Sequence, residues 1–176
     1  MSYFAAAAVR NATGWAAAEV DLSGVNDVEE VADRLRDVDP EADLSLLFVE
    51  SDDVYLVILR LDEGEDLRVF GSDSAFAEES RLGAVLLDDL KPPPLGVEEA
   101  LGEEAQAGDD EESVERSVAH ADVEPVGDPD LLSDLGVPAH RLLALCAQEG
   151  MLPADVTAEV CQVIGCGDEI EELREV

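Results

Sequence analysis

Four residues near the C-terminus have side chains that bind metals or act as nucleophiles: His140, Cys146, Cys161 and Cys166. Structural zinc sites usually contain a close pair of ligands such as Cys-x-x-Cys. This chain has no such pair, and six positions separate His140 from Cys146. Cys146 belongs to an apolar helical stripe and Cys161 flanks another, which is typical of cysteines that pack as small hydrophobes. We therefore expect no metal site.

The two histidines give no basis for a catalytic device. His120 lies in a strongly acidic segment, in His120-Ala121-Asp122, and His140 lies at the start of a predicted helix beside Arg141. Neither follows a predicted strand or neighbours a nucleophile, as a Ser-His or Cys-His arrangement requires. We expect both to be surface residues, and we expect no catalytic residue and no enzymatic activity.

Paired carboxylates are the remaining candidates for acid–base chemistry or calcium binding. A calcium loop needs ligands at alternating positions, a glycine bend and a terminal glutamate. Segment 62–66, Asp-Glu-Gly-Glu-Asp, has the charges without this spacing, and 44 acidic residues produce adjacent pairs by chance. The chain also lacks a glycine-rich phosphate loop. We therefore expect solvated carboxylates and no cofactor. The pairs are Asp52-Asp53, Glu78-Glu79, Asp88-Asp89 and Asp109-Asp110.

The overall charge limits the partners of the chain. Of its 176 residues 44 are acidic and 10 are basic, which gives a net charge of -34. Such a surface repels phosphates, so we expect no direct binding to nucleic acid or to an anionic membrane. No apolar run reaches the roughly 18 residues of a membrane-spanning helix, and no cationic stretch precedes the first apolar run as in a signal peptide. An odd number of cysteines indicates a reducing compartment, so we expect a cytoplasmic protein. A halophilic or GC-rich source is an alternative reason for the acidity.

The pattern predicts an α+β domain over residues 1–90. We expect strands at Tyr3–Arg10 and Trp15–Leu22, joined by a hairpin turn at residues 11–14. A helix capped by Asn26 follows, with its apolar stripe at i, i+3, i+4 and i+7, and ends at Asp39-Pro40. Further predicted elements are strands at 44–49, 54–61 and 67–70 and a helix at 75–90. Because the strand at 54–61 is apolar on both faces, it should be central in an antiparallel sheet with packed helices.

The remainder divides into a linker and a small helical region. Residues 91–127 begin Lys-Pro-Pro-Pro and are dominated by acidic residues, which predicts an acidic, disordered linker. Residues 128–176 predict a small bundle of short helices with starts at Pro129, Pro138 and Pro153 and stops at Gly136, Gly150 and Gly165. We place Val156, Val160, Val163 and Ile164 on the buried face of the third helix. This region would be only marginally stable alone, so we expect it to pack on the sheet or on a partner.

A series of short segments resembles a known family. The matching segments are Ser2–Ala7, Gly14-Trp15, Glu19–Leu22, Leu46–Glu50, Arg68–Phe70 with Ser72-Asp73, Val126–Leu132, Leu142–Cys146 and Leu152–Val156. In this order they resemble the actinobacterial family of tRNA adenosine deaminase-associated proteins. The family is named for its gene neighbourhood beside the deaminase that converts adenosine to inosine in tRNA. The resemblance implies no catalytic residue, and it makes 91–127 a variable acidic spacer.

The pattern of residues indicates that the chain is not itself the deaminase. Zinc-dependent nucleobase deaminases use His-x-Glu followed by Pro-Cys-x-x-Cys, whereas His120-Ala121-Asp122 has Asp in place of Glu and no Pro-Cys-x-x-Cys follows. We expect a non-enzymatic accessory protein that binds another protein, with the tRNA adenosine deaminase as the partner that the resemblance suggests. The alternative is an acidic nucleic-acid mimic that occupies the basic groove of its target as an inhibitor.

Overall fold

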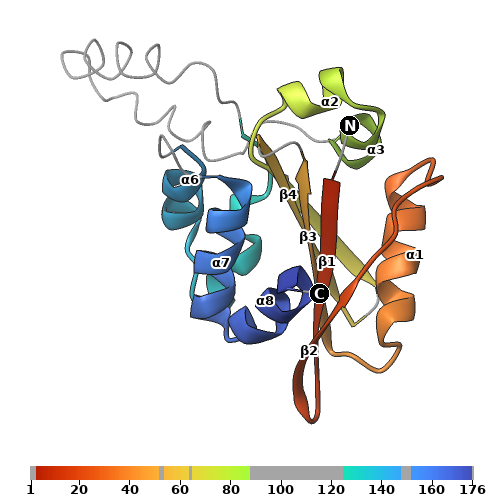
Figure 1. The fold of residues 1–176 in the computed structure, drawn as a ribbon, viewed down its shortest axis with the longest axis vertical. Helices are drawn as coiled ribbons and strands as arrows, with labels where there is room; N and C mark the ends of the chain where they lie inside the picture. Colours follow the sequence, from red (N-terminus) through yellow and green to blue (C-terminus); the bar gives the residue numbers. More distant parts are fainter. Residues whose placement is uncertain (1–2, 52–53, 64, 88–124, 148–151, 176) are drawn as a thin grey trace.

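The computed structural model describes residues 3–51, 54–63, 65–87, 125–147 and 152–175. These residues form a six-stranded antiparallel sheet with helices on both faces (Figure 1). The strand order is β2-β1-β3-β4-β5-β6. The strands are β1 (Tyr3–Asn11), β2 (Gly14–Glu19), β3 (Leu44–Ser51), β4 (Tyr55–Asp62), β5 (Asp66–Gly71) and β6 (Val126–Gly127). The predicted α+β class is confirmed.

The β1–β2 hairpin forms where the sequence predicts it. Asn11 pairs with Gly14, and the two residues between them form the turn. Asn11 Oδ1 accepts from the backbone N–H of Thr13 at 2.9 Å, as an Asx turn does. Gly14 has φ +128°, a value that residues with a side chain rarely adopt. The turn therefore places β2 next to β1, and β2 forms one edge of the described sheet.

The predicted central position of β4 is also confirmed. β4 lies between β3 and β5, and residues 55–61 are buried on both faces of the sheet. One set of alternate residues, including Val57 and Leu59, faces a core with α1 (Val28–Val38), α2 (Ala75–Glu79) and α3 (Arg81–Leu87). The other set, including Leu56 and Ile58, faces the C-terminal helices. Two covered faces explain why the strand has no polar alternation.

Helix α1 has the predicted apolar stripe but a different N-terminal cap. Val31, Ala32 and Leu35 are buried, as expected for the i, i+3, i+4 pattern. The cap residue is Asp27 rather than Asn26, because Asp27 Oδ1 accepts from the backbone N–H of Glu30 at 3.0 Å. Asn26 lies one residue earlier, and its side chain donates to Glu30 at 3.3 Å instead.

The prediction of one continuous helix at 75–90 is wrong. Ser80 separates α2 from α3, with extended backbone at φ -141° and ψ 140°. Its hydroxyl accepts from the backbone N–H groups of Leu82 at 3.1 Å and Gly83 at 3.4 Å, so it caps α3. A serine that offers this bond competes with helix continuation, which apolar periodicity alone does not reveal. Residues 88–90 lie outside the described part of the chain.

The C-terminal region covers the second face of the sheet (Figure 1). Its elements are the 3-10 helix η1 (Pro129–Leu135) and the α-helices α6 (Ala139–Ala147), α7 (Pro153–Ile164) and α8 (Gly167–Glu175). Asp128 caps η1, and Gly136 and Gly165 end η1 and α7 with positive φ. The predicted stop at Gly150 lies outside the described residues.

The buried face of α7 differs from the prediction at its C-terminal end. Val156 and Val160 are buried as expected, but Thr157 and Cys161 share their face. Val163 is instead 41% exposed. A broad run of apolar residues is compatible with either stripe, and contact with the sheet decides between them.

The predicted linker ends too late in the sequence. Val126–Gly127 forms β6, which pairs with β5 through Gly71↔Val126 and Phe70↔Gly127. A Cβ on Gly127 would lie 2.2 Å from the carbonyl oxygen of Val69, so only glycine permits this approach. Two residues are too few for a periodicity to be visible. Residues 91–124 lie outside the described part of the chain, and their disorder stays a prediction.

Candidate functional site

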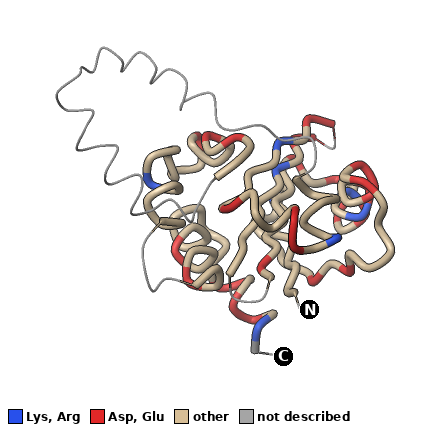
Figure 2. Tube along the Cα trace, turned by 90° about the horizontal axis from the view of Figure 1, so that it is seen from above, with Lys and Arg blue, Asp and Glu red and all other residues tan. Residues whose placement is uncertain are grey.

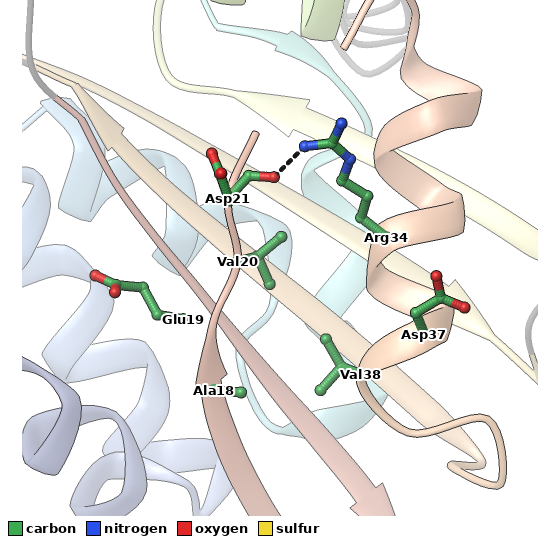
Figure 3. Close-up of a pocket in the computed structure, with 7 residues that line it drawn as sticks. All are labelled: Ala18, Glu19, Val20, Asp21, Arg34, Asp37 and Val38. Carbon is green, nitrogen blue, oxygen red and sulfur yellow. Dashed lines mark hydrogen bonds between the residues drawn. The ribbon is translucent and has the colours of Figure 1, made fainter. Parts of the chain in front are cut away.

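A surface groove lies where the end of β2 passes α1 (Figure 3). Its volume is about 440 Å³. The strand side is formed by residues 18–21, and the helix side by Arg34, Asp37 and Val38. The groove exists because the chain leaves the β1–β2 ladder after Val20, whose N–H donates to the carbonyl of Ala5 at 2.9 Å.

Hydrogen bonds fix the strand side of this groove. Arg34 reaches across from α1 and donates to the backbone carbonyl of Asp21 (Figure 3). It also donates to the backbone carbonyl of Ser23 at 3.0 Å. The Asp21 carboxylate accepts from the Ser23 hydroxyl at 2.7 Å, from the Ser23 N–H at 2.9 Å and from the Tyr3 hydroxyl at 3.4 Å. The bonds from Ser23 hold the pKa of Asp21 below its ordinary value, so this carboxylate is charged at neutral pH.

Carboxylates lie on both sides of the strand at this point. In Figure 3 the side chains of Glu19 and Asp21 project to one side of the strand, and α1 with Asp37 lies on the other. Among the described residues that line the groove, Arg34 is the one cation, and its guanidinium already donates to two carbonyls. The groove therefore offers uncompensated negative charge, which suits a cationic group.

β2 also leaves one side of its backbone unpaired within the described part of the chain. Residues that exchange hydrogen bonds with the partner strand alternate with residues that do not. Val20 N–H bonds to Ala5, and Gly14 pairs with Asn11 across the two-residue turn. The even-numbered residues of β2 therefore direct their backbone N–H and C=O groups toward β1. Trp15, Ala17 and Glu19 therefore direct their N–H and C=O groups away from the sheet.

Elsewhere, buried polar groups attach the C-terminal region to the sheet. Arg60 on β4 has a side chain that is only 7% exposed. It donates to the Leu131 carbonyl at 2.6 Å, to Asp134 at 2.9 Å and to Asp62 at 3.1 Å. The hydrogen bond from Arg60 lowers the pKa of Asp134, and the same bond raises the pKa of Arg60. This guanidinium has a structural role because the protein itself occupies its donors.

A second ion pair, which is partly buried, joins the last helix to β3. Arg174 on α8 forms a bidentate pair with Glu50, one bond of which measures 2.9 Å. The guanidinium of Arg174 also lies 4.7 Å from the centre of the Phe4 ring. Planar arginine can pair with a carboxylate and contact an aromatic ring at once, so α8 has a defined position on the sheet.

The cysteines and His140 do not assemble into a site. Cys161 and Cys166 are buried in the core between the sheet and the helices, whereas His140 is exposed on α6. Burial raises the pKa of Cys146 to about 12, and a hydrogen bond with Cys166 together with burial raises that of Cys161. Thiolate formation is therefore unfavourable at both. Among the described residues no three His, Cys, Asp or Glu side chains converge on a point where a metal ion would fit.

The other candidate residues are dispersed or lie outside the described part. Glu78 and Glu79 are both exposed on α2. In segment 62–66 the Asp62 carboxylate pairs with Arg60 and Arg68. His120 and the pairs Asp52-Asp53, Asp88-Asp89 and Asp109-Asp110 lie outside the described residues.

Sequence reasoning did not find the groove or the strand edge. Glu19 and Asp21 stand at alternate positions, which places them on one side of a strand, and Arg34 and Asp37 are three apart on a helix. These spacings occur throughout an acidic chain. Only the packing of α1 beside the end of β2 makes one site of them, and no signal in the sequence specified that packing.

Comparison with known proteins provides one match. Residues 3–167 match the family described as Rv3753c-like tRNA adenosine deaminase-associated protein. Neither the curated proteins nor the solved structures contain a significant match. No helix in the described ranges is long and apolar enough to span a membrane. Since the family match extends over both the sheet and the C-terminal helices, the chain belongs to the Rv3753c-like tRNA adenosine deaminase-associated proteins.

Proposed function

We propose that this protein is a non-enzymatic, cytoplasmic accessory protein that binds the tRNA adenosine deaminase. The observation that carries the proposal is the family match over residues 3–167, because the family is described by its association with that enzyme. The dispersal of the candidate nucleophiles, bases and metal ligands supports a binding role rather than a catalytic one.

The distribution of charge supports a protein partner with a basic surface. Acidic positions lie on many sides of the described chain, and basic positions are few (Figure 2). Every arginine in the described ranges already contacts a carboxylate, a carbonyl, an amide or an aromatic ring of the protein itself. These contacts involve Arg10, Arg34, Arg36, Arg60, Arg68, Arg81, Arg141 and Arg174. Few cations are therefore left to bind phosphates, whereas many carboxylates are available to a basic protein.

The test is to mix the purified protein with the tRNA adenosine deaminase of the same organism and to measure complex formation by size-exclusion chromatography. We expect a complex whose affinity falls as salt rises, since opposite charges attract less when screened. An unrelated acidic protein of similar charge is the control for non-specific attraction. Absence of a complex at every ionic strength would refute the proposal.

Addition of tRNA separates an accessory protein from an inhibitor. An accessory protein that binds outside the tRNA-binding groove remains in a ternary complex with enzyme and tRNA. A nucleic-acid mimic competes for the groove, so tRNA would displace it and it would inhibit deamination. We expect the ternary complex.

A further inference from the structure

The two edges of the sheet differ in how well they are protected. β6 contributes only two residues at one edge, and short edge strands resist pairing with other chains. β2 has six residues at the other edge and pairs with β1 without an irregularity from Asn11↔Gly14 to Ala6↔Glu19. It contains no proline, lysine or bulge, the usual protections of an exposed edge.

The side chains of β2 leave its edge accessible. The strand reads Gly-Trp-Ala-Ala-Ala-Glu, so its centre has only methyl groups. Ala16 and Glu19 are exposed, and Ala17 and Ala18 are half-buried against the two faces of the sheet. Trp15 lies close to Gly165, beside the start of α8. None of the described helices occupies a place in the ladder next to β2.

The backbone supplies a regular row of hydrogen-bonding groups. The N–H and C=O groups of Trp15, Ala17 and Glu19 point outward, and no described residue bonds to their N–H groups. An extended peptide placed about 4.8 Å away matches this spacing and gains main-chain hydrogen bonds, as in β-augmentation.

The charged side chains near the edge of β2 determine which kind of peptide can bind there. Glu19 and Asp21 stand on one side of the strand and Asp37 on the other, at the groove that continues the edge. A second copy of this chain would bring its own net charge of -34 and the same carboxylates to the contact, which opposes self-pairing. A segment rich in lysine or arginine meets complementary charge on both of its faces.

We infer that the outer edge of β2 is a docking site for an extended, cationic segment of a partner protein, which adds as a seventh strand beside Trp15–Glu19. The identity of that partner as the deaminase rests on the proposed function. The edge itself does not depend on that identity, and its charge and backbone geometry define what it accepts.

The direct test uses a ten-residue synthetic peptide with lysine alternating with threonine and valine. Amide exchange of the full-length protein is followed residue by residue. In the free protein the N–H groups of Trp15, Ala17 and Glu19 should exchange fast, and those of Ala16 and Ala18, which face β1, slowly. The peptide should slow exchange at the first three by more than tenfold. The control is the same peptide with alternate backbone nitrogens methylated, which keeps the charge and loses the donors. Equal binding of both peptides, or unchanged exchange at the three residues, would overturn the inference.

Variants of the edge test the same point with the deaminase. Ala17→Pro removes an outward N–H and leaves the bonds to β1 intact, so the fold should persist and binding should weaken on the order of tenfold. Glu19→Gln with Asp37→Asn should weaken binding roughly threefold at low salt, whereas Glu78→Gln with Glu79→Gln on α2, an equal change in charge, should have less effect. If Ala17→Pro does not fold, the exchange experiment on the unaltered protein decides.

The two proposals fail in different ways. If the deaminase binds Ala17→Pro as well as the unaltered protein and leaves the three amides unchanged, the docking site is wrong and the accessory role stands. If the deaminase does not bind but the peptide protects the edge, the accessory role is wrong and the docking site stands. Dimerisation of the protein alone, with protection of the same amides, would show that the occupant is a second copy and would overturn the inference.

Discussion

The two faces of the sheet are covered in different ways. The face toward α1, α2 and α3 is a continuous apolar core covered by helices close in sequence to the strands, and the bonds that Arg34 and Arg81 on these helices make to other segments are exposed. The opposite face is covered by helices from the end of the chain, and it contains the ion pairs of Arg60 and Arg174, each of which has one buried partner. These pairs join residues 74 and 124 positions apart. The difference indicates that apolar burial suffices where a short loop limits the position of a helix, whereas a distant region gains its orientation from directional bonds.

The largest expected effect tests whether the two faces unfold together. Leu35 on α1 and Leu142 on α6 are both 0% exposed, one on each face. Leu35→Ala and Leu142→Ala should each lower the free energy of unfolding by about 2–5 kcal/mol, because each leaves a cavity. Urea unfolding followed by circular dichroism should show one transition, shifted in both variants. A separate transition affected by Leu142→Ala alone would make residues 128–176 an independent unit, as the predicted division of the chain suggests.

Removal of an arginine should lower the free energy of unfolding more on the C-terminal face, where the arginine is buried, than on the α1 face. Arg60→Met keeps the apolar stem and loses the bonds to Asp134 and Asp62, and it leaves the Leu131 carbonyl without its donor. The cost should be about 1–3 kcal/mol in the free energy of unfolding. Arg34→Met is the control, since Arg34 is an exposed donor on the other face, and it should cost under about 1 kcal/mol. Equal costs in chemical denaturation would contradict the difference between the faces.

A cap variant measures how much a local feature contributes on the α1 side. Asp27→Ala removes the acceptor for the N–H of Glu30 and should cost about 1 kcal/mol in thermal or urea unfolding. Asn26→Ala changes the neighbouring polar residue without removing the cap, and a smaller effect is expected. If Asn26→Ala were the more destabilising substitution, the cap identified by geometry would be wrong.

The smallest expected effect is the dependence of stability on pH that the Arg60–Asp134 pair contributes on the C-terminal side. The bond from Arg60 holds the pKa of Asp134 below its ordinary value of 3.8. The stabilisation is therefore complete above pH 3.8 and is lost as the pH falls through the lower pKa of the folded protein. Asp134 is 61% exposed, so solvent screens the pair and the change is small. Urea midpoints from about pH 5 to pH 2.5 should fall less in Arg60→Met than in the unaltered protein. If the urea midpoints of the two proteins fell equally with pH, the Arg60–Asp134 pair would make no pH-dependent contribution to stability.

The sequence by itself determined the elements whose signals are local. The hairpin at Asn11–Gly14, the apolar stripe of α1 and the doubly buried β4 follow from turn chemistry and from periods of 3.6 and 2 residues, which neighbours in the chain largely fix. It also determined the net charge of -34. The resemblance of its segments identified the family.

Only the tertiary structure decided how distant residues meet. The partners of Arg60 and Arg174, the two-residue strand β6 and the groove between β2 and α1 all depend on contacts between segments far apart in the sequence. Asp134 and Glu50 are ordinary members of a set of 44 acidic residues until packing brings an arginine to them. Likewise, Trp15–Glu19 reads as a strand in the sequence, but it is an edge only because no described strand follows it in the sheet. Strand order is a property of the whole fold, because each pairing depends on which surfaces the other elements have already buried.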